Sequence, residues 1–231
     1  MGLATYKDLC IDVADARTSG EYWSTMLGWR VEMHDDGDAH LRDDSGRIQV
    51  WLNVVPEPKS VKNRVHLDVN AESVQRALDA GATVVEEYPR WTTLLDPDGQ
   101  EHCVFPRAEP VEKRPYELVW DCHEGAQPSH DLAAWWCGVV GGSVVDDDDD
   151  DDEGGFSFIR DMPDCPWDFF VFGGVPEPKT VKNRVHIDVR TDDLEALTAH
   201  GATVVRAKGD GGLGWTVMAD PAGNEFCAFT D

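Results

Sequence analysis

A stretch of fifteen residues occurs twice in this chain of 231 residues and constrains its architecture more than any other feature. Residues 55–69 read VPEPKSVKNRVHLDV and residues 175–189 read VPEPKTVKNRVHIDV, so the two stretches differ at two positions. The match continues further along the chain. ALDAGATVVEE at 77–87 is similar to ALTAHGATVVRA at 196–207, and LLDPDGQEHCVF at 94–105 is similar to MADPAGNEFCAF at 218–229. Self-similarity over so long a period indicates two copies of one structural unit.

Each copy contains the same local pattern twice. In the first copy, apolar alternation predicts strands at 8–13 and 64–69. The residues at 16–27 predict a helix that ends at a glycine, and a second helix is expected at 71–81. Further strands follow each helix, so the order strand, helix, strand, strand, strand occurs four times in the chain. We therefore predict an α+β fold built from four βαβββ modules.

The junction between the copies lies in PRAEPVEKRP, residues 106–115. Its prolines and charges suit a linker between two folded units. The sequence therefore predicts one domain at residues 1–108, a linker at 109–115 and a second domain at 116–231, with two modules in each domain.

The charge balance excludes several classes of partner. Twenty basic residues against forty-five acidic ones give a net charge of −25, which disfavours nucleic acid and anionic membrane surfaces. We see neither an apolar run long enough to span a membrane nor a signal-peptide pattern, and the six cysteines form no C-x-x-C pair. We expect a cytoplasmic protein. The eight acidic residues at 146–153 predict a solvated hairpin loop.

Several motifs recur in both copies and carry a family resemblance. The first copy contains YWSTMLGW, NRVHLDV, DAGATVV and DPDGQEHCVF, and the second contains AAWWCGVVGG, NRVHIDV, AHGATVV and DPAGNEFCAF. These motifs resemble the vicinal oxygen chelate superfamily of glyoxalases, bleomycin-resistance proteins and dioxygenases, and in particular its glyoxalase-like subgroup. The resemblance implies two cup-shaped half-barrels, each made of two modules. We expect modules one and two to form the first cup and modules three and four the second, and the alternative is that modules pair between the copies.

The resemblance also implies a small-molecule ligand in each cup. One hypothesis is an enzyme that performs proton transfer, isomerisation, lyase or dioxygenase-type chemistry. The alternative is a non-catalytic protein that sequesters a drug or metabolite. A monomer with two internal sites is expected, and a homodimer is the alternative.

Relatives that use a metal place ligands on the first and last strands of their modules. Carried over to this chain, the last-strand positions fall at Cys103 and Cys227, and Glu101 and Glu225 lie two residues earlier on the same face. The candidate ligand sets are Asp8, Gln49, His66 and Glu101, and Glu117, His186 and Glu225. Mg, Mn, Fe, Ni and Zn are the candidate divalent ions, and a metal-free protein is the alternative. The histidines also serve as acid or base near neutral pH. The candidate catalytic residues are His66, Asp68, Glu101, His186, Asp188 and Glu225.

The remaining candidates line a ligand pocket. Tryptophans suit planar ligands, and the two arginines are expected to meet an anion at the mouth of a cup. The predicted pocket residues are Asp12, Trp51, Arg64, Trp91, Cys103, Asp121, Arg184, Trp215 and Cys227.

Overall fold

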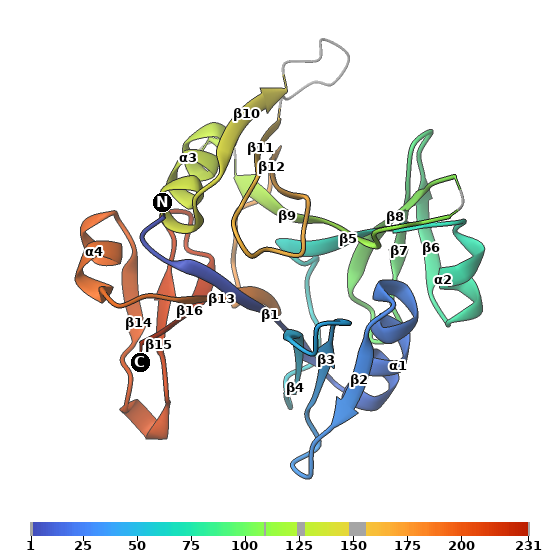
Figure 1. The fold of residues 1–231 in the computed structure, drawn as a ribbon, viewed down its shortest axis with the longest axis horizontal. Helices are drawn as coiled ribbons and strands as arrows, with labels where there is room; N and C mark the ends of the chain where they lie inside the picture. Colours follow the sequence, from blue (N-terminus) through green and yellow to red (C-terminus); the bar gives the residue numbers. More distant parts are fainter. Residues whose placement is uncertain (1, 109, 124–127, 148–155, 231) are drawn as a thin grey trace.

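A computed structural model describes residues 2–108, 110–123, 128–147 and 156–230. The predicted α+β fold of four βαβββ modules is confirmed (Figure 1). Module one contains β1 (Thr5–Val13), α1 (Ala16–Leu27), β2 (Arg30–Met33), β3 (Ala39–Arg42) and β4 (Ile48–Val54). Module two contains β5 (Val65–Ala71), α2 (Gln75–Asp79), β6 (Thr83–Glu87), β7 (Thr92–Leu95) and β8 (Glu101–Pro106).

The second copy repeats this order. Module three contains β9 (Pro115–His123), α3 (Ser129–Val140), β10 (Ser143–Asp147), β11 (Phe156–Arg160) and β12 (Phe169–Val175). Module four contains β13 (Val185–Arg190), α4 (Leu194–Ala199), β14 (Thr203–Arg206), a 3-10 turn η1 (Asp210–Gly212), β15 (Thr216–Ala219) and β16 (Glu225–Phe229). Residues 148–155 lie outside the described part of the chain, so the acidic hairpin loop stays a prediction.

The bounds of α1 agree with the predicted helix at both ends. Asp15 caps its first turn, because Oδ1 accepts hydrogen bonds from the backbone N–H groups of Arg17 and Thr18. Gly28 ends it with φ at 74°, a left-handed conformation that glycine adopts without strain. By contrast α2 is shorter than predicted, and its N-cap residue Val74 provides no side-chain hydrogen bond. Within the described ranges, no helix is long and apolar enough to cross a lipid bilayer.

The two sheets do not follow the two sequence copies. Sheet A has the strand order β14-β15-β16-β13-β1-β4-β3-β2, and sheet B has the order β10-β11-β12-β9-β5-β8-β7-β6. Sheet A therefore joins modules one and four, and sheet B joins modules two and three (Figure 1). The central contacts are antiparallel pairs of β1 with β13 and of β5 with β9. The expected pairing of modules within each copy is wrong.

The helices connect modules of the same copy instead. From α1, Trp23 donates a hydrogen bond through Nε1 to Oδ2 of Asp96, in the turn between β7 and β8, at 3.0 Å. From α3, Trp136 makes the equivalent bond to Asp220 at 3.1 Å. Both indoles are fully buried, so each helix contributes a large apolar surface to its own copy. Core packing thus holds each copy together, while the sheets join the copies to one another.

The repeated stretch forms the two crossings between the sheets. Residues 55–64 run from β4 to β5, and Glu101 Oε1 accepts a hydrogen bond from Lys59 at 2.7 Å. Glu101 Oε2 also accepts the backbone N–H of Asn63 at 3.1 Å. Glu225 holds the second crossing through Lys179 at 2.9 Å and the N–H of Asn183 at 3.1 Å. The ion pairs explain why lysine recurs, and the asparagines recur because Asn63 and Asn183 donate side-chain hydrogen bonds to Gln100 at 2.6 Å and to Asn224 at 2.9 Å.

Candidate functional site

Each sheet has a pocket lined by alternate side chains of its central strands, because successive side chains of a strand point to opposite faces. In β13, Val185 and Ile187 are buried in the core, and His186 and Asp188 line the pocket of sheet A. We name this pocket cup A, with a volume of about 510 Å³, and the pocket of sheet B cup B, with a volume of about 710 Å³.

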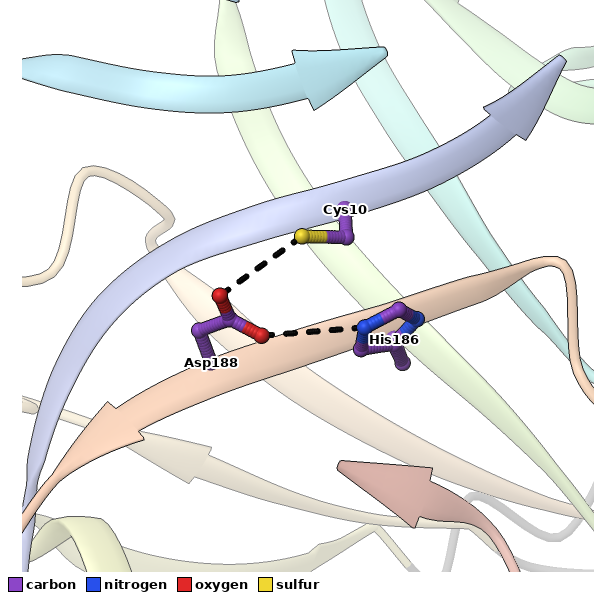
Figure 2. Close-up of side chains that lie close together, drawn as sticks. All are labelled: Cys10, His186 and Asp188. Atoms are coloured by element: carbon purple, nitrogen blue, oxygen red, sulfur yellow. Dashed lines mark hydrogen bonds and ion pairs between the residues drawn. The ribbon is translucent and has the colours of Figure 1, made fainter. Parts of the chain in front are cut away.

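Three side chains from both copies meet at the floor of cup A (Figure 2). Cys10 on β1 lies with Sγ 3.6 Å from Oδ2 of Asp188 on β13. His186 lies with Nε2 3.6 Å from Oδ1 of Asp188 and 3.5 Å from Sγ of Cys227 on β16. The potential ligand atoms of Cys10, His186 and Asp188 are all within 4.8 Å of one another. Cup A therefore gathers a thiol, an imidazole and a carboxyl group in one place.

Burial controls the protonation of this group. Burial, and then the nearby Asp8 carboxylate, raise the pKa of Asp188 to about 8, although Lys7 partly offsets them. Burial and the charge of Lys182 lower the pKa of His186 to about 4. Burial therefore favours the uncharged forms of both His186 and Asp188.

Aromatic side chains form the walls of cup B. Trp91 stacks on Phe105 with ring centroids 5.7 Å apart, and Tyr116 packs edge-on against Phe105 at 5.0 Å. The guanidinium of Arg107 lies 4.8 Å from the centroid of Tyr116. In the described part of the chain, no carboxylate lies within ion-pair distance of Arg107. The aromatic lining of the pocket comprises Trp91, Phe105, Tyr116, Phe156, Phe158 and Phe169.

A histidine–aspartate pair and a glutamate form the floor of cup B. Nδ1 of His66 lies 2.9 Å from Oδ1 of Asp68, which also accepts the backbone N–H of Cys103 at 3.0 Å. Burial disfavours the imidazolium of His66, but the charge and hydrogen bond of Asp68 outweigh burial and raise its pKa. Burial, and then the charge of Asp68, raise the pKa of Glu117 to about 7. A glutamate with a pKa of about 7 and a histidine with a raised pKa thus share one pocket.

Two groups among the described residues have donor atoms close enough to hold a metal ion. One is Cys10, His186 and Asp188 in cup A, and the other is His66, Asp68 and Cys103 in cup B. In cup A, Nδ1 of His186 and Oδ1 of Asp188 are buried and have no hydrogen-bond partner in the described part of the chain. In cup B, Asp68 already bonds to both other members of its group. Since an unpaired buried polar atom is costly, cup A fits a metal ion better.

The expected ligand sets are not formed, because the modules pair across the copies. Asp8 and Gln49 belong to sheet A, whereas His66 and Glu101 belong to sheet B. Lys7 pairs with Asp8 at 2.6 Å, and Gln49 donates a hydrogen bond to Asp43 at 2.6 Å.

The second expected set is divided in the same way. Glu117 lies in cup B beside Asp68, while His186 and Glu225 belong to sheet A. Both Glu101 and Glu225 are engaged with the lysines of the crossings. Neither glutamate belongs to a metal-binding group of the described residues.

The predicted pocket residues are distributed over three places. Asp12, Trp51, Trp215 and Cys227 line cup A, and Trp91 and Cys103 line cup B. Asp121 is paired with Lys62. Arg64 and Arg184 line neither cup. They lie in a third cavity between the two crossings.

Cys10 is the site residue that the sequence interpretation missed. It lies directly opposite His186 in the β1–β13 pair, as Val119 lies opposite His66 in the other sheet. A signal was present, because LCIDV at 9–13 aligns with VHIDV at 185–189. Comparing modules one and four, instead of only the two copies, places Cys10 at the position of His186. Tyr116 and Arg107 gave no comparable signal.

Comparison with known proteins supports the fold. A family model described as a glyoxalase-like domain matches residues 8–105 and 117–229. Glyoxalase I from Zea mays has a TM-score of 0.67 and 12% identity, over 97% of this chain and 92% of that chain. A putative dioxygenase from Bacillus subtilis subsp. subtilis str. 168 has a TM-score of 0.58 and 13% identity, over 100% and 86%.

A further structure, the cppA protein from Streptococcus pneumoniae TIGR4, has a TM-score of 0.50 and 12% identity, over 98% of this chain and 99% of that chain. No curated protein matches the chain. At these identities the solved structures establish the fold alone, and the family model covers most of both copies. The chain therefore belongs to the glyoxalase-like domain family of the vicinal oxygen chelate superfamily and contains that domain twice.

Proposed function

We propose that cup B binds a small aromatic organic anion and moves a proton on it. The observation that carries this proposal is an acid–base group enclosed by aromatic walls. Trp91 and Phe105 provide flat apolar surfaces that suit a planar ring. Arg107 provides a cation for a carboxylate or similar group on the ligand.

The floor of cup B supports isomerisation by paired proton transfer. Glu117, with a pKa of about 7, is ionised in a large fraction of molecules at neutral pH and can take a proton from a ligand carbon. His66, with its raised pKa, can donate a proton to a ligand oxygen. Asp68 holds the imidazole in position through the contact at Nδ1. One proton is removed and one is added, so the ligand keeps its composition and net charge.

Phenylpyruvate is a suitable probe, because it combines a ring, a carboxylate and an exchangeable proton beside a carbonyl. We expect the protein to accelerate its keto–enol exchange, followed by enol absorbance. His66→Asn should lower the rate by about a hundredfold or more, since general acid catalysis contributes at least this much. The matched control is His186→Asn, which changes the equivalent residue of cup A and should leave the rate unchanged.

Binding is measured separately by calorimetry with the same compound. Trp91→Ala should weaken the affinity by about tenfold, the scale of one aromatic contact, while Trp215→Ala in cup A should not. If phenylpyruvate binds but its keto–enol exchange is not accelerated, the result favours the second candidate function, which is a protein that sequesters its ligand. If it does not bind, the proposal for cup B is wrong.

A metal in cup A is a separate proposal, supported by the unpaired buried atoms there. Cys10, His186 and Asp188 would hold the ion, and the neutral His186 keeps a lone pair for it. Imidazole and thiolate ligands favour Zn, Ni or Fe over Mg. When bound, such an ion polarises an oxygen of a ligand.

A further inference from the structure

A third cavity lies between the two crossings and belongs to neither cup. It has a volume of about 650 Å³ and is lined by residues 57–64 of the first crossing and by most of residues 177–184 of the second. The crossings also contact each other, because Nη1 of Arg184 donates a hydrogen bond to the backbone oxygen of Glu57 at 2.8 Å. We name this space the central cavity.

The two crossings are far more alike than the two cups. The repeated stretches differ at two positions of fifteen, and Lys62, Asn63 and Arg64 recur as Lys182, Asn183 and Arg184. The cups differ in the residues that face each other across neighbouring strands. Cys10 and Trp51 form such a pair in sheet A, and the equivalent pair in sheet B is Val119 and Val171. Ion pairs with Glu101 and Glu225 account for the lysine at 59 and 179, and side-chain hydrogen bonds to residues 100 and 224 account for the asparagine at 63 and 183. They do not account for the arginines.

The arginines leave positive charge in the central cavity. Lys62 and Lys182 are paired with Asp121 and Asp12. Within the described ranges, neither Arg64 nor Arg184 has a carboxylate at ion-pair distance. Besides Asp12, the lining contains two carboxylates, those of Glu57 and Glu177, and both residues are exposed to solvent. Two guanidinium groups that lack a carboxylate partner among the described residues attract an anion, even in a chain with a net charge of −25.

Arg64 has unused hydrogen-bonding capacity. Its Nε is buried and has no partner in the part of the chain that the structure describes. The equivalent Nε of Arg184 donates to the backbone oxygen of Asp12 at 3.1 Å. A buried donor without a partner is costly unless a ligand completes it.

The same cavity also offers apolar contacts. Val61 and Val181 are 42% and 44% exposed, and both line the central cavity. Pro58 and Pro178 lie beside them. We propose that the central cavity binds one small organic anion with two acidic groups, which are carboxylates or phosphates that bridge Arg64 and Arg184.

Calorimetric titration of the intact protein with citrate, and separately with inorganic pyrophosphate, tests this proposal at constant ionic strength. We expect one anion per chain, because the arginines of both crossings serve a single cavity. The variant R64Q/R184Q should weaken binding by about tenfold or more, the effect of losing charge-assisted contacts. The matched control R30Q/R160Q removes the same charge from two exposed arginines outside the cavity and should bind like the original chain.

Single variants keep the test valid if the double variant folds poorly, since Arg184 also bonds to two backbone oxygens. Arg64→Gln should lower the affinity, and Arg64→Lys should restore part of it through its charge. Binding of citrate alone assigns carboxylate chemistry, and binding of pyrophosphate alone assigns phosphate chemistry. The proposal is overturned if neither anion binds, if two bind per chain, or if R64Q and R30Q/R160Q bind equally.

Discussion

At the residue scale, the same pair of side chains has different protonation in the two cups. His66 and Asp68 are spaced as His186 and Asp188 are. In cup B the contact with Asp68 raises the pKa of His66 despite burial. In cup A burial dominates, and the pKa of His186 falls to about 4. The difference arises because Asp68 lies 2.9 Å from His66 and bonds to it, whereas Asp188 lies 3.6 Å from His186. The charge of Lys182 adds to burial in cup A, so the two cups suit different chemistry.

Glu117 provides a pH-dependent prediction at this scale. Its folded pKa of about 7 lies above the ordinary value of 4.5, so the folded state holds a proton that the unfolded state releases. The protein should therefore lose stability as pH rises from the unfolded pKa to the folded pKa. Glu117→Gln removes this effect and should be more stable than the original chain by about 1–2 kcal/mol at about pH 8, allowing for partial solvent screening.

Urea denaturation at about pH 4 and about pH 8 measures the difference, which should be much smaller at the lower pH. Glu87→Gln, at an exposed position of β6, is the control and should show no such change. An equal stability gap for Glu117→Gln at both pH values would contradict the assigned cause.

At the element scale, β1 and β13 come from different copies and together supply the candidate metal-binding group of cup A. Cys10 and His186 face each other across this antiparallel pair, and Asp188 follows two residues later on the same face. β5 and β9 form the equivalent pair in cup B, where Val119 replaces the thiol. The two strand pairs are alike in backbone pairing and differ in their potential ligand atoms, which is why we propose a metal in cup A only.

Adding Zn²⁺ to chelator-treated protein should raise its melting temperature. When the free Zn²⁺ concentration is about a hundred times the dissociation constant, the free energy of unfolding should rise by about 2.7 kcal/mol. For a chain of this size, this corresponds to a rise in melting temperature of roughly 5–10 °C. Cys10→Val gives cup A the residue of cup B and should remove most of the rise. His66→Ala in cup B should keep it. A rise that depends on His66 and not on Cys10 would refute the assignment to cup A.

At the scale of the whole molecule, each copy is a packing unit and each cup is shared between copies. Trp23 and Trp136 anchor the helices within their own copies. The sheets continue from one copy into the other through β1–β13 and β5–β9. One copy alone would leave β1 and β5 each with an unpaired edge, which favours association.

A fragment of residues 1–108 should therefore form a homodimer. β1 of one protomer would pair with β5 of the other, as β1 pairs with β13 and β5 with β9 in the full chain. Size-exclusion chromatography with light scattering measures the mass, and the full chain is the control. A folded monomeric fragment with native-like circular dichroism would show that modules one and two can complete a cup by themselves.

Local sequence determined the modules and many of their faces. The repeat established four βαβββ units, Asp15 and Gly28 set the bounds of α1, and alternation placed His66 and Asp68 on one face. Only the tertiary structure decided which modules share a sheet, and with that which side chains meet. The physical reason is that backbone hydrogen bonds between strand edges are the same for any partner, so β1 could pair with β5 or β13. The choice depends on helix packing and on the crossings, which placed Cys10 beside His186 and brought Arg64 and Arg184 together.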